Sequence, residues 1–265
     1  MDTQNFCTVT EVNIDGIPVI FLRNSGQEPK PIIFLFHKLL NNKIKELSLA
    51  YVLASAGYFV VGIDMYGHGD REESFDKSRK YEFNNLFYDV YRTARDIPAI
   101  IEFLKEQKSL NLDFLNIGAV GVSIGGSIAL VAGYLFKEIK FVTSIVGTCD
   151  WKYVLDNDLL STFRFFAKSR KVMLLYDKVI RDIEEYEPIN NYNFDNMIHI
   201  LFLNGAMDTS MPLEAVKQYH KRFYELFSSK GKGEYLDFMV YPKAGHEVTA
   251  EMVKDLLEWL KKRAK

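Results

Sequence analysis

The sequence has few cysteines, and its first residues carry no export signal. Only Cys7 and Cys149 occur among 265 residues, so at most one disulfide could form, which is too few for a small secreted domain built on disulfides. Asp2 stands where a signal peptide would carry positive charge, and no apolar stretch follows it. No apolar run reaches the roughly 18 residues that a membrane span needs. We therefore expect reduced thiols, a cytoplasmic protein and no membrane partner.

The sequence also lacks an excess of either charge and the common motifs for metals and cofactors. Its 33 Lys and Arg nearly balance 35 Asp and Glu, giving a formal net charge of -2 with no long run of one sign, so we expect no nucleic-acid partner. There is no His-Glu-x-x-His pattern and no cysteine pair at ligand spacing. The glycines of residues 121–126 lack the spacing of a dinucleotide-binding fingerprint. We expect neither a metal nor a cofactor.

The sequence contains many segments that are typical of β-strands. Hydrophobic residues are 48% of the chain, enough for a substantial core. Thr8–Ile14 and Ile17–Arg23 flank Asp15-Gly16, a pair that tolerates the positive φ angles of a tight turn, so an N-terminal β-hairpin is predicted. Later runs are largely apolar on both faces and suit buried parallel strands: Pro31–Phe36, Tyr58–Ile63, Ile117–Val122, Phe141–Val146, Met197–Leu203 and Leu236–Tyr241.

Segments with helical spacing of apolar residues alternate with these strands. They are Ile44–Ala56, Leu86–Leu104, Ser127–Phe136, Leu213–Phe227 and Met252–Leu260. Such an order buries a mostly parallel sheet between two layers of helices, so we expect one α/β domain over residues 1–265. Pro98 interrupts the second helical segment, where we expect a kink.

One interval, residues 150–196, is too long for a single crossover helix. It is rich in helix formers and in aromatic side chains, so we predict a small helical cap inserted over one end of the sheet. Extra core helices without ligand contact are the alternative. The aromatic residues are Trp151, Tyr153, Phe163, Phe165, Phe166, Tyr176, Tyr186 and Tyr192.

Residues 121–126 read GVSIGG and form the strongest catalytic motif in the sequence. They close a predicted strand and precede a predicted helix, which is the setting of a nucleophile elbow, a sharp turn that exposes a serine. Glycines two positions before and after Ser123 leave room for the tight backbone. We predict Ser123 as a nucleophile, with a structural serine in a glycine turn as the alternative.

A serine hydroxyl is hardly ionised near neutral pH, so it needs a base and a group that orients the base. Five histidines compete. We expect His199 in the core and His220 at the surface, while His37 and His68 lie near the sheet edge but precede the serine in sequence. His246 follows the last strand in a loop that can carry an imidazole over the sheet edge. We predict His246 as the base.

We predict Asp208 as the acid that orients the histidine. It leaves a strand through a turn and enters a helix, at the same sheet edge as Ser123. Asp208 could instead only cap that helix. Asp150, just past another strand, is the competing acid.

The tetrahedral intermediate of acyl transfer needs two donors aimed at its oxygen. One should be the amide of Ile124, directly after the nucleophile at a helix start, where helix polarity favours negative charge. The other should come from the loop after Pro31–Phe36, from Lys38 or Leu39.

These motifs resemble the α/β-hydrolase superfamily over nearly the full chain, including its serine, acid, histidine order. The nearest branch joins dienelactone-hydrolase-like esterases with the catalytic domain of prolyl oligopeptidases. Phe36-His37 resembles the family's oxyanion loop, which implies Leu39 as the donor, although Lys38 replaces the usual glycine. Residues 64–69 (DMYGHG) resemble a structural turn of the family, so His68 receives no catalytic role. Dienelactone hydrolases proper have cysteine where Ser123 stands.

We therefore expect a carboxylesterase-type serine hydrolase that cleaves a small-molecule ester through an acyl-enzyme. His37 and Trp151 are expected to contact the substrate, and the aromatic cap suggests an apolar acyl or aryl group. An aminopeptidase, amidase or thioesterase could use the same residues. A binding protein that has lost catalysis is the alternative from another class. The oligomeric state stays open, a homodimer included.

Overall fold

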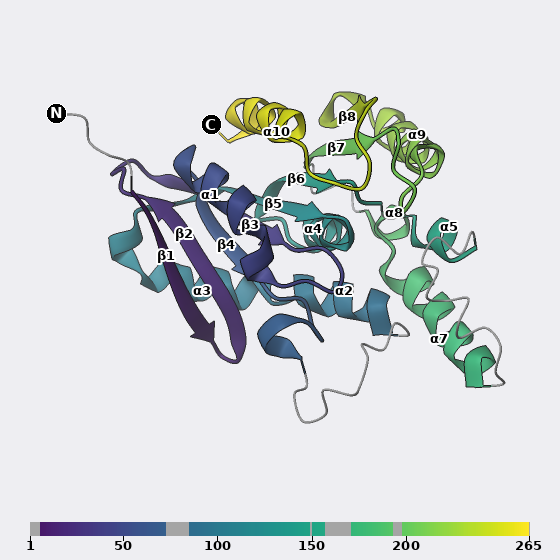
Figure 1. Cartoon of the computed structure of the whole chain (residues 1–265), viewed down its shortest axis with the longest axis horizontal. Coiled ribbons are helices and arrows are strands. Elements are labelled where there is room, and N and C mark those ends of the chain that lie inside the picture. Colours follow the sequence, from purple (N-terminus) through teal and green to yellow (C-terminus); the bar gives the residue numbers. More distant parts are fainter. Residues whose placement is uncertain (1–5, 73–84, 149, 157–170, 193–197, 265) are drawn as a thin grey trace.

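The computed structural model describes residues 6–72, 85–148, 150–156, 171–192 and 198–264. Within them the chain forms an eight-stranded sheet in the order β1-β2-β4-β3-β5-β6-β7-β8 (Figure 1). β1 pairs antiparallel with β2 and β2 with β4, and all other pairs are parallel. The strands are β1 Cys7–Ile14, β2 Ile17–Asn24, β3 Lys30–Phe36, β4 Phe59–Ile63, β5 Leu112–Val122, β6 Ile139–Ile145, β7 His199–Gly205 and β8 Leu236–Tyr241.

Helices cover both faces of this sheet. The α-helices are α1 Leu47–Ser55, α2 Leu86–Ala94, α3 Ile97–Glu106, α4 Ile124–Leu135, α5 Trp151–Asp156, α7 Lys171–Tyr186, α8 Pro188–Asn191, α9 Leu213–Ser229 and α10 Ala250–Arg263. Short 3-10 turns are η1 Lys43–Glu46, η2 Gly69–Arg71, η4 Lys108–Leu110 and η5 Gly233–Tyr235. None of the helices seen in the described ranges is both long and apolar enough to cross a bilayer.

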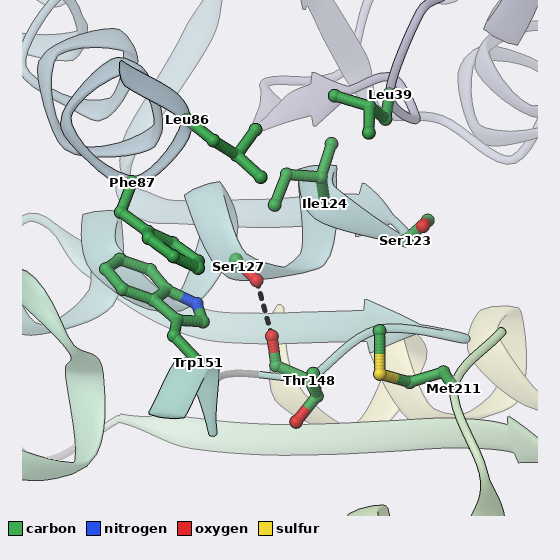
Figure 2. A pocket seen from close by; sticks show the side chains of 9 residues that line it. All are labelled: Leu39, Leu86, Phe87, Ser123, Ile124, Ser127, Thr148, Trp151 and Met211. Atoms are coloured by element: carbon green, nitrogen blue, oxygen red, sulfur yellow. Dashed lines mark hydrogen bonds between the residues drawn. The ribbon is translucent and has the colours of Figure 1, made fainter. Parts of the chain in front are cut away.

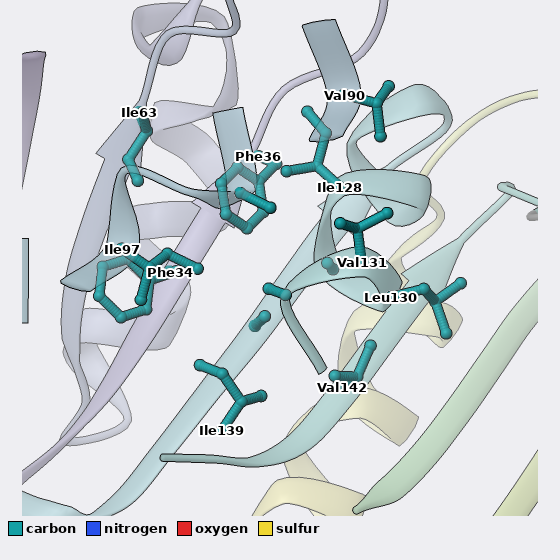
Figure 3. Packing of buried hydrophobic residues seen from close by; sticks show 14 of the residues in the cluster. Phe34, Phe36, Ile63, Val90, Ile97, Ile128, Leu130, Val131, Ile139 and Val142 are labelled. Atoms are coloured by element: carbon teal, nitrogen blue, oxygen red, sulfur yellow. The ribbon is translucent and has the colours of Figure 1, made fainter. Parts of the chain in front are cut away.

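Alternate residues of each central strand bury opposite faces. On β3, Phe34 and Phe36 join a cluster with α2, α3, α4 and α9, whereas Ile33 and Leu35 join a cluster with α1 and α10. Figure 3 shows the first cluster, where side chains of β3, α2 and α4 gather. Full burial of such a side chain contributes about 1.5–3 kcal/mol relative to exposure. Burial on both faces of the sheet explains why the central strands are apolar throughout. The arrangement of strands and helices is the α/β-hydrolase fold.

The helical segment predicted over 86–104 is two helices. The helical conformation is interrupted at Arg95 and Asp96, and Pro98 lies in the first turn of α3. Proline is tolerated there because the first N–H groups of a helix have no intrahelical partner. The expected kink is therefore a full break between α2 and α3.

Parts of the predicted cap, residues 150–196, lie outside the described residues. These parts include Phe163, Phe165, Phe166 and the side chain of Tyr176. The strand start expected at Met197 also lies outside the described residues. The described part holds α5, α7 and α8. Tyr186 of α7 stacks on Tyr91 of α2 at 4.1 Å between ring centres. Helix α7 thus packs beside α2, while α8 packs against α4 and α7. The role of these helices as a cap stays a prediction.

Candidate active site

A strained turn joins β5 to α4 and carries Ser123. The backbone of Ser123 has φ 56° and ψ -119°, a conformation that costs on the order of 1–3 kcal/mol in a non-glycine residue. Its N–H donates to the carbonyl of Ile145 at 2.8 Å. A Cβ on Gly121 would lie 1.9 Å from the carbonyl oxygen of Gly125, and one on Gly125 would lie 2.3 Å from the carbonyl oxygen of Phe36. Glycine is therefore required at both positions by close backbone approach.

His246 lies between Ser123 and Asp208. Its Nε2 is 2.9 Å from Ser123 Oγ, and its Nδ1 is 2.8 Å from Asp208 Oδ2. A carboxylate can only accept, so Nδ1 carries the proton and donates to Asp208. The lone pair of Nε2 then faces the serine hydroxyl. The His246 side chain is 26% exposed, so the ring is partly accessible from solvent.

Asp208 is buried and held from several sides. Its Oδ1 accepts the N–H groups of Ser210 at 2.9 Å and Met211 at 2.8 Å, which leaves Oδ2 directed at His246. The loop after β7 is bonded to the loop after β8, because the N–H of Met207 donates to the carbonyl of Ala244 at 2.9 Å. Asp208 and His246 are therefore held together by two loops that are hydrogen-bonded to each other.

Asp150 has a different role in the structure. Its Oδ1 accepts the N–H of Tyr153 at 2.9 Å, and its Oδ2 lies 3.4 Å from Arg222 Nη1. These bonds begin α5 and tie it to α9. Among the bonds described for Asp150, none reaches the imidazole of His246.

The expectation that His37 contacts substrate is wrong. Its side chain is fully buried. Its Nδ1–H donates to the carbonyl of Lys38 at 2.8 Å, while Nε2 accepts the N–H of Met65 at 3.0 Å. Burial lowers the pKa of His37 to about 4, so the ring is neutral at neutral pH. His37 instead joins the loop after β3 to the loop after β4.

The other histidines contact groups other than the nucleophile. His199 is half-buried and stacks on Tyr235 at 4.3 Å between ring centres. His220, expected at the surface, is half-buried against Phe238, and burial lowers its pKa. His68 Nδ1 bonds the carbonyl oxygen of Tyr66 at 3.0 Å and belongs to the turn after β4.

Sequence reasoning missed the ion pair that secures the loop after β3. Lys43 Nζ lies 2.7 Å from Asp64 Oδ2 and 2.5 Å from Asp70 Oδ2, and the Lys43 side chain is only 4% exposed. Asp64 also accepts the backbone N–H groups of Lys43 and Asp70. A lysine in a polar stretch, NNKIKE, gives no signal of burial. Only the turn at 64–69 was recognisable as structural.

The residues expected to supply the oxyanion donors lie beside the nucleophile. Ile124 is the first residue of α4, and a Cβ on the next residue, Gly125, would come within 2.7 Å of the carbonyl oxygen of His37. The elbow therefore abuts the loop that carries Leu39. Leu39 is half-buried and lines the same pocket as Ile124, whereas Lys38 is exposed (Figure 2).

A small pocket opens beside Ser123. Its walls come from the loop after β3, from α2, α4 and α5, and from the loops after β6 and β7 (Figure 2). Trp151 forms one wall and stacks on Phe87 with ring centres 4.7 Å apart. The other lining residues are Leu39, Leu86, Phe87, Ser123, Ile124, Ser127, Thr148 and Met211. Trp151 lines this pocket, and its expected contact with the substrate stays a prediction.

Glu187 holds the start of α5 and thus the backbone of Trp151. Its Oε1 accepts the N–H of Trp151 at 2.7 Å and that of Lys152 at 3.2 Å, and Oε2 accepts from Asn190 Nδ2 at 2.9 Å. Burial, partly offset by these bonds and reinforced by the Asp150 carboxylate, raises the pKa of Glu187 to about 7. No sequence motif distinguished this glutamate. Within the described residues, no group of three or more His, Cys, Asp or Glu could hold a metal ion.

The chain is similar to known proteins over most of its length. It is 23% identical over 254 residues to the Bacillus subtilis (strain 168) protein named "Putative esterase YitV", covering 93% of this chain and 95% of that one. TT1662 from Thermus thermophilus shares the fold with a TM-score of 0.68 at 18% identity, over 98% of this chain and 99% of that one. Acetyl xylan esterase 1 from Thermoanaerobacterium sp. JW/SL YS485 also shares the fold, with a TM-score of 0.67 at 17% identity, over 99% of this chain and 89% of that one.

A family model matches most of the chain. The matched residues, 46–265, include the elbow and the loops after β7 and β8. This match covers far more than half of the sequence. The chain belongs to the prolyl oligopeptidase family.

Proposed function

We propose that the protein is a serine esterase that cleaves small carboxylic esters through an acyl-enzyme. The observation that carries the proposal is the continuous chain from Asp208 Oδ2 through both nitrogens of His246 to Ser123 Oγ, at 2.8 and 2.9 Å. A base within hydrogen-bond reach of a serine, itself oriented by a third group, is the arrangement that activates this nucleophile.

In the first half of the proposed reaction, His246 Nε2 takes the hydroxyl proton of Ser123 while Oγ attacks the ester carbonyl carbon. The tetrahedral intermediate carries its negative charge on the former carbonyl oxygen, which receives hydrogen bonds from the amides of Ile124 and Leu39. When the bond to the leaving oxygen breaks, His246 returns the proton to it and an alcohol leaves. The acyl group stays bonded to Ser123.

In the second half, a water molecule replaces the alcohol. His246 takes a proton from the water, the remaining hydroxide attacks the acyl carbon, and the bond to Ser123 Oγ breaks. The proton on His246 then returns to Ser123, and a carboxylic acid leaves. Asp208 keeps its negative charge throughout and stabilises the imidazolium that forms in each half.

Related proteins support an ester rather than an amide as the substrate. One relative is named an esterase and one protein of similar fold is an acetyl xylan esterase, while the family as a whole is named for peptidases. The test is a panel with one acyl group and three leaving groups: a p-nitrophenyl acetate, a p-nitroacetanilide and an acetyl thioester. We expect the ester to have the highest kcat/KM relative to its uncatalysed rate.

Two serine variants complete this test. Ser123→Ala should lose turnover, whereas Ser229→Ala should retain it, because Ser229 is exposed on α9 and its hydroxyl donates to the carbonyl of Leu226 in the same helix. A higher kcat/KM relative to the uncatalysed rate for the anilide or the thioester would replace the esterase assignment with a peptidase or a thioesterase. Equal turnover by both variants would remove Ser123 from the mechanism.

A further inference from the structure

The indole N–H of Trp151 is a buried donor without an acceptor. The residue is 1% exposed, and among the residues that the structure describes Nε1 has no hydrogen-bond partner. An unsatisfied buried donor costs about 1–3 kcal/mol, so native proteins retain few of them. Trp259, the other tryptophan, has its Nε1 bonded to Asp237 Oδ2 at 2.7 Å. No group among the described residues accepts this N–H, so the donor at Trp151 is available to an acceptor of a bound ligand.

Two polar side chains of the pocket lining, Ser127 and Thr148, already have partners. The hydroxyl of Ser127 donates to the carbonyl oxygen of Thr148, and the hydroxyl oxygen of Thr148 accepts the N–H of Asp150 at 3.1 Å. Figure 2 shows the indole nitrogen on the ring edge that faces Ser127 and the interior of the pocket. The ring itself is held by the stack on Phe87 and by the backbone bond to Glu187. The donor is thus fixed in place and directed into the pocket.

The pocket is small and uncharged. The space inside it that a water-sized group can enter is about 40 Å³. A single water needs roughly 10–15 Å³ on the same measure, so there is room for about three or four non-hydrogen atoms. Among the residues that the structure describes, no charged side chain lines it, so a buried carboxylate or ammonium of the ligand would stay uncompensated. The occupant must therefore be short and neutral.

The acyl part of an ester is the group that fits this position. Ser123 lines the pocket, and in the acyl-enzyme the acyl carbon is bonded to its Oγ. The departing alcohol, in contrast, must lie beside His246 Nε2 to receive its proton. The lining includes neither His246 nor any other residue of the loop after β8. The pocket therefore takes the acyl group and leaves the alcohol outside.

We propose that Trp151 Nε1 donates a hydrogen bond to an oxygen within a short neutral acyl group, so that the preferred substrates are esters of small oxygen-bearing acids. Hydroxyacyl, alkoxyacyl and ketoacyl groups belong to this class. The inference rests on the proposed esterase function. It assigns the specificity to one atom of the chain.

Two pairs of p-nitrophenyl esters test this, each pair differing by one oxygen in place of one methylene. They are methoxyacetate against butyrate, and 3-methoxypropionate against pentanoate. For each pair, the preference is the kcat/KM of the ether ester divided by that of the alkyl ester. The ether oxygen also changes the intrinsic reactivity, so the preference of the wild type is divided by that of Trp151→Phe, which keeps an aromatic ring but lacks the N–H. We expect the wild-type preference to be about tenfold larger for at least one pair, which is the size of one hydrogen bond.

Ratios near one for both pairs, with all four esters hydrolysed, would overturn the role of Trp151 and leave the esterase proposal standing. Hydrolysis of none of the four by the wild type would instead defeat the esterase proposal. The two failures are therefore distinguishable.

A second measurement holds even if Trp151→Phe folds poorly. The chain has two tryptophans, so an ¹H–¹⁵N spectrum of Ser123→Ala contains two indole signals, and the bonded Trp259 is an internal reference. Addition of methyl methoxyacetate or methyl 3-methoxypropionate should move the Trp151 signal downfield, and methyl butyrate or pentanoate should not. A Trp151 signal that responds equally to ethers and alkyl esters would overturn the proposal.

Discussion

His246 Nε2 lies 2.9 Å from Ser123 Oγ although 123 positions separate the two residues along the chain. The parallel sheet explains this meeting. β5 and β8 run in the same direction, so the turn after β5 and the loop after β8 emerge at the same edge. The loop after β7, between them in the chain, brings Asp208 within 2.8 Å of the same imidazole.

Replacing Asp208 with asparagine should lower kcat by about 10⁴, because an amide in place of the carboxylate favours the wrong tautomer of the histidine. Steady-state kinetics with p-nitrophenyl acetate measures the effect. Asp150→Asn is the matched control, since Asp150 begins α5 and pairs with Arg222. Near-normal activity in Asp208→Asn, with a large loss in Asp150→Asn, would exchange their roles.

Gly121→Ala should destabilise the fold by about 4 kcal/mol or more, because its new Cβ would meet backbone atoms that cannot move aside. The nearest is the carbonyl oxygen of Gly125 at 1.9 Å. Urea unfolding gives the free energy of unfolding. Gly231→Ala is the control: its φ of +68° is unfavourable for alanine, but nothing lies within 4 Å, so a loss of about 1–2 kcal/mol is expected. Equal losses would contradict the steric origin of the elbow glycines.

Much of the fold followed from local pattern, and so did the choice of candidate site residues. Strands apolar on both faces, the Asp15-Gly16 turn and the glycines around Ser123 each have a local physical cause that is visible in sequence. Contacts between distant segments have none. The burial of His37 and of Lys43 depends on the loop after β4, whose side chains meet them only in the folded chain.

Lys43→Met should cost about 3–5 kcal/mol, since it leaves the fully buried carboxylate of Asp64 without its cation. The double variant Lys43→Met/Asp64→Asn should be less destabilised than the sum of the two single losses. Urea unfolding of all four proteins completes the cycle. Additive losses would mean that the pair does not interact across the loop.

Glu187 should make stability fall as pH rises from about 4.5 to about 7. Burial raises its pKa to about 7 in the folded chain from the ordinary value of 4.5, so the folded state binds the extra proton in this window. Unfolding free energy then decreases with pH, by at most about 1.4 kcal/mol per pH unit for one proton. The contribution is fully present below the unfolded pKa and lost above the folded one.

Glu187→Gln isolates this contribution, because it keeps the shape and removes the titration. The groups that face Glu187 are Asp150 and Arg222, together with Asn190, and they stay in both proteins. The difference in unfolding free energy, wild type minus variant, should decline between pH 5 and pH 7. A difference that is flat or rises over this range would contradict the raised pKa.

Labelling of the nucleophile tests the central claim most directly. A fluorophosphonate bonds only to a serine that a neighbouring base has activated, and mass spectrometry of the digested protein identifies the residue that carries it. We expect one phosphonyl group on Ser123, slow labelling in His246→Ala and none at this site in Ser123→Ala. Labelling that is absent from the wild type, or that is unchanged in His246→Ala, would contradict the account.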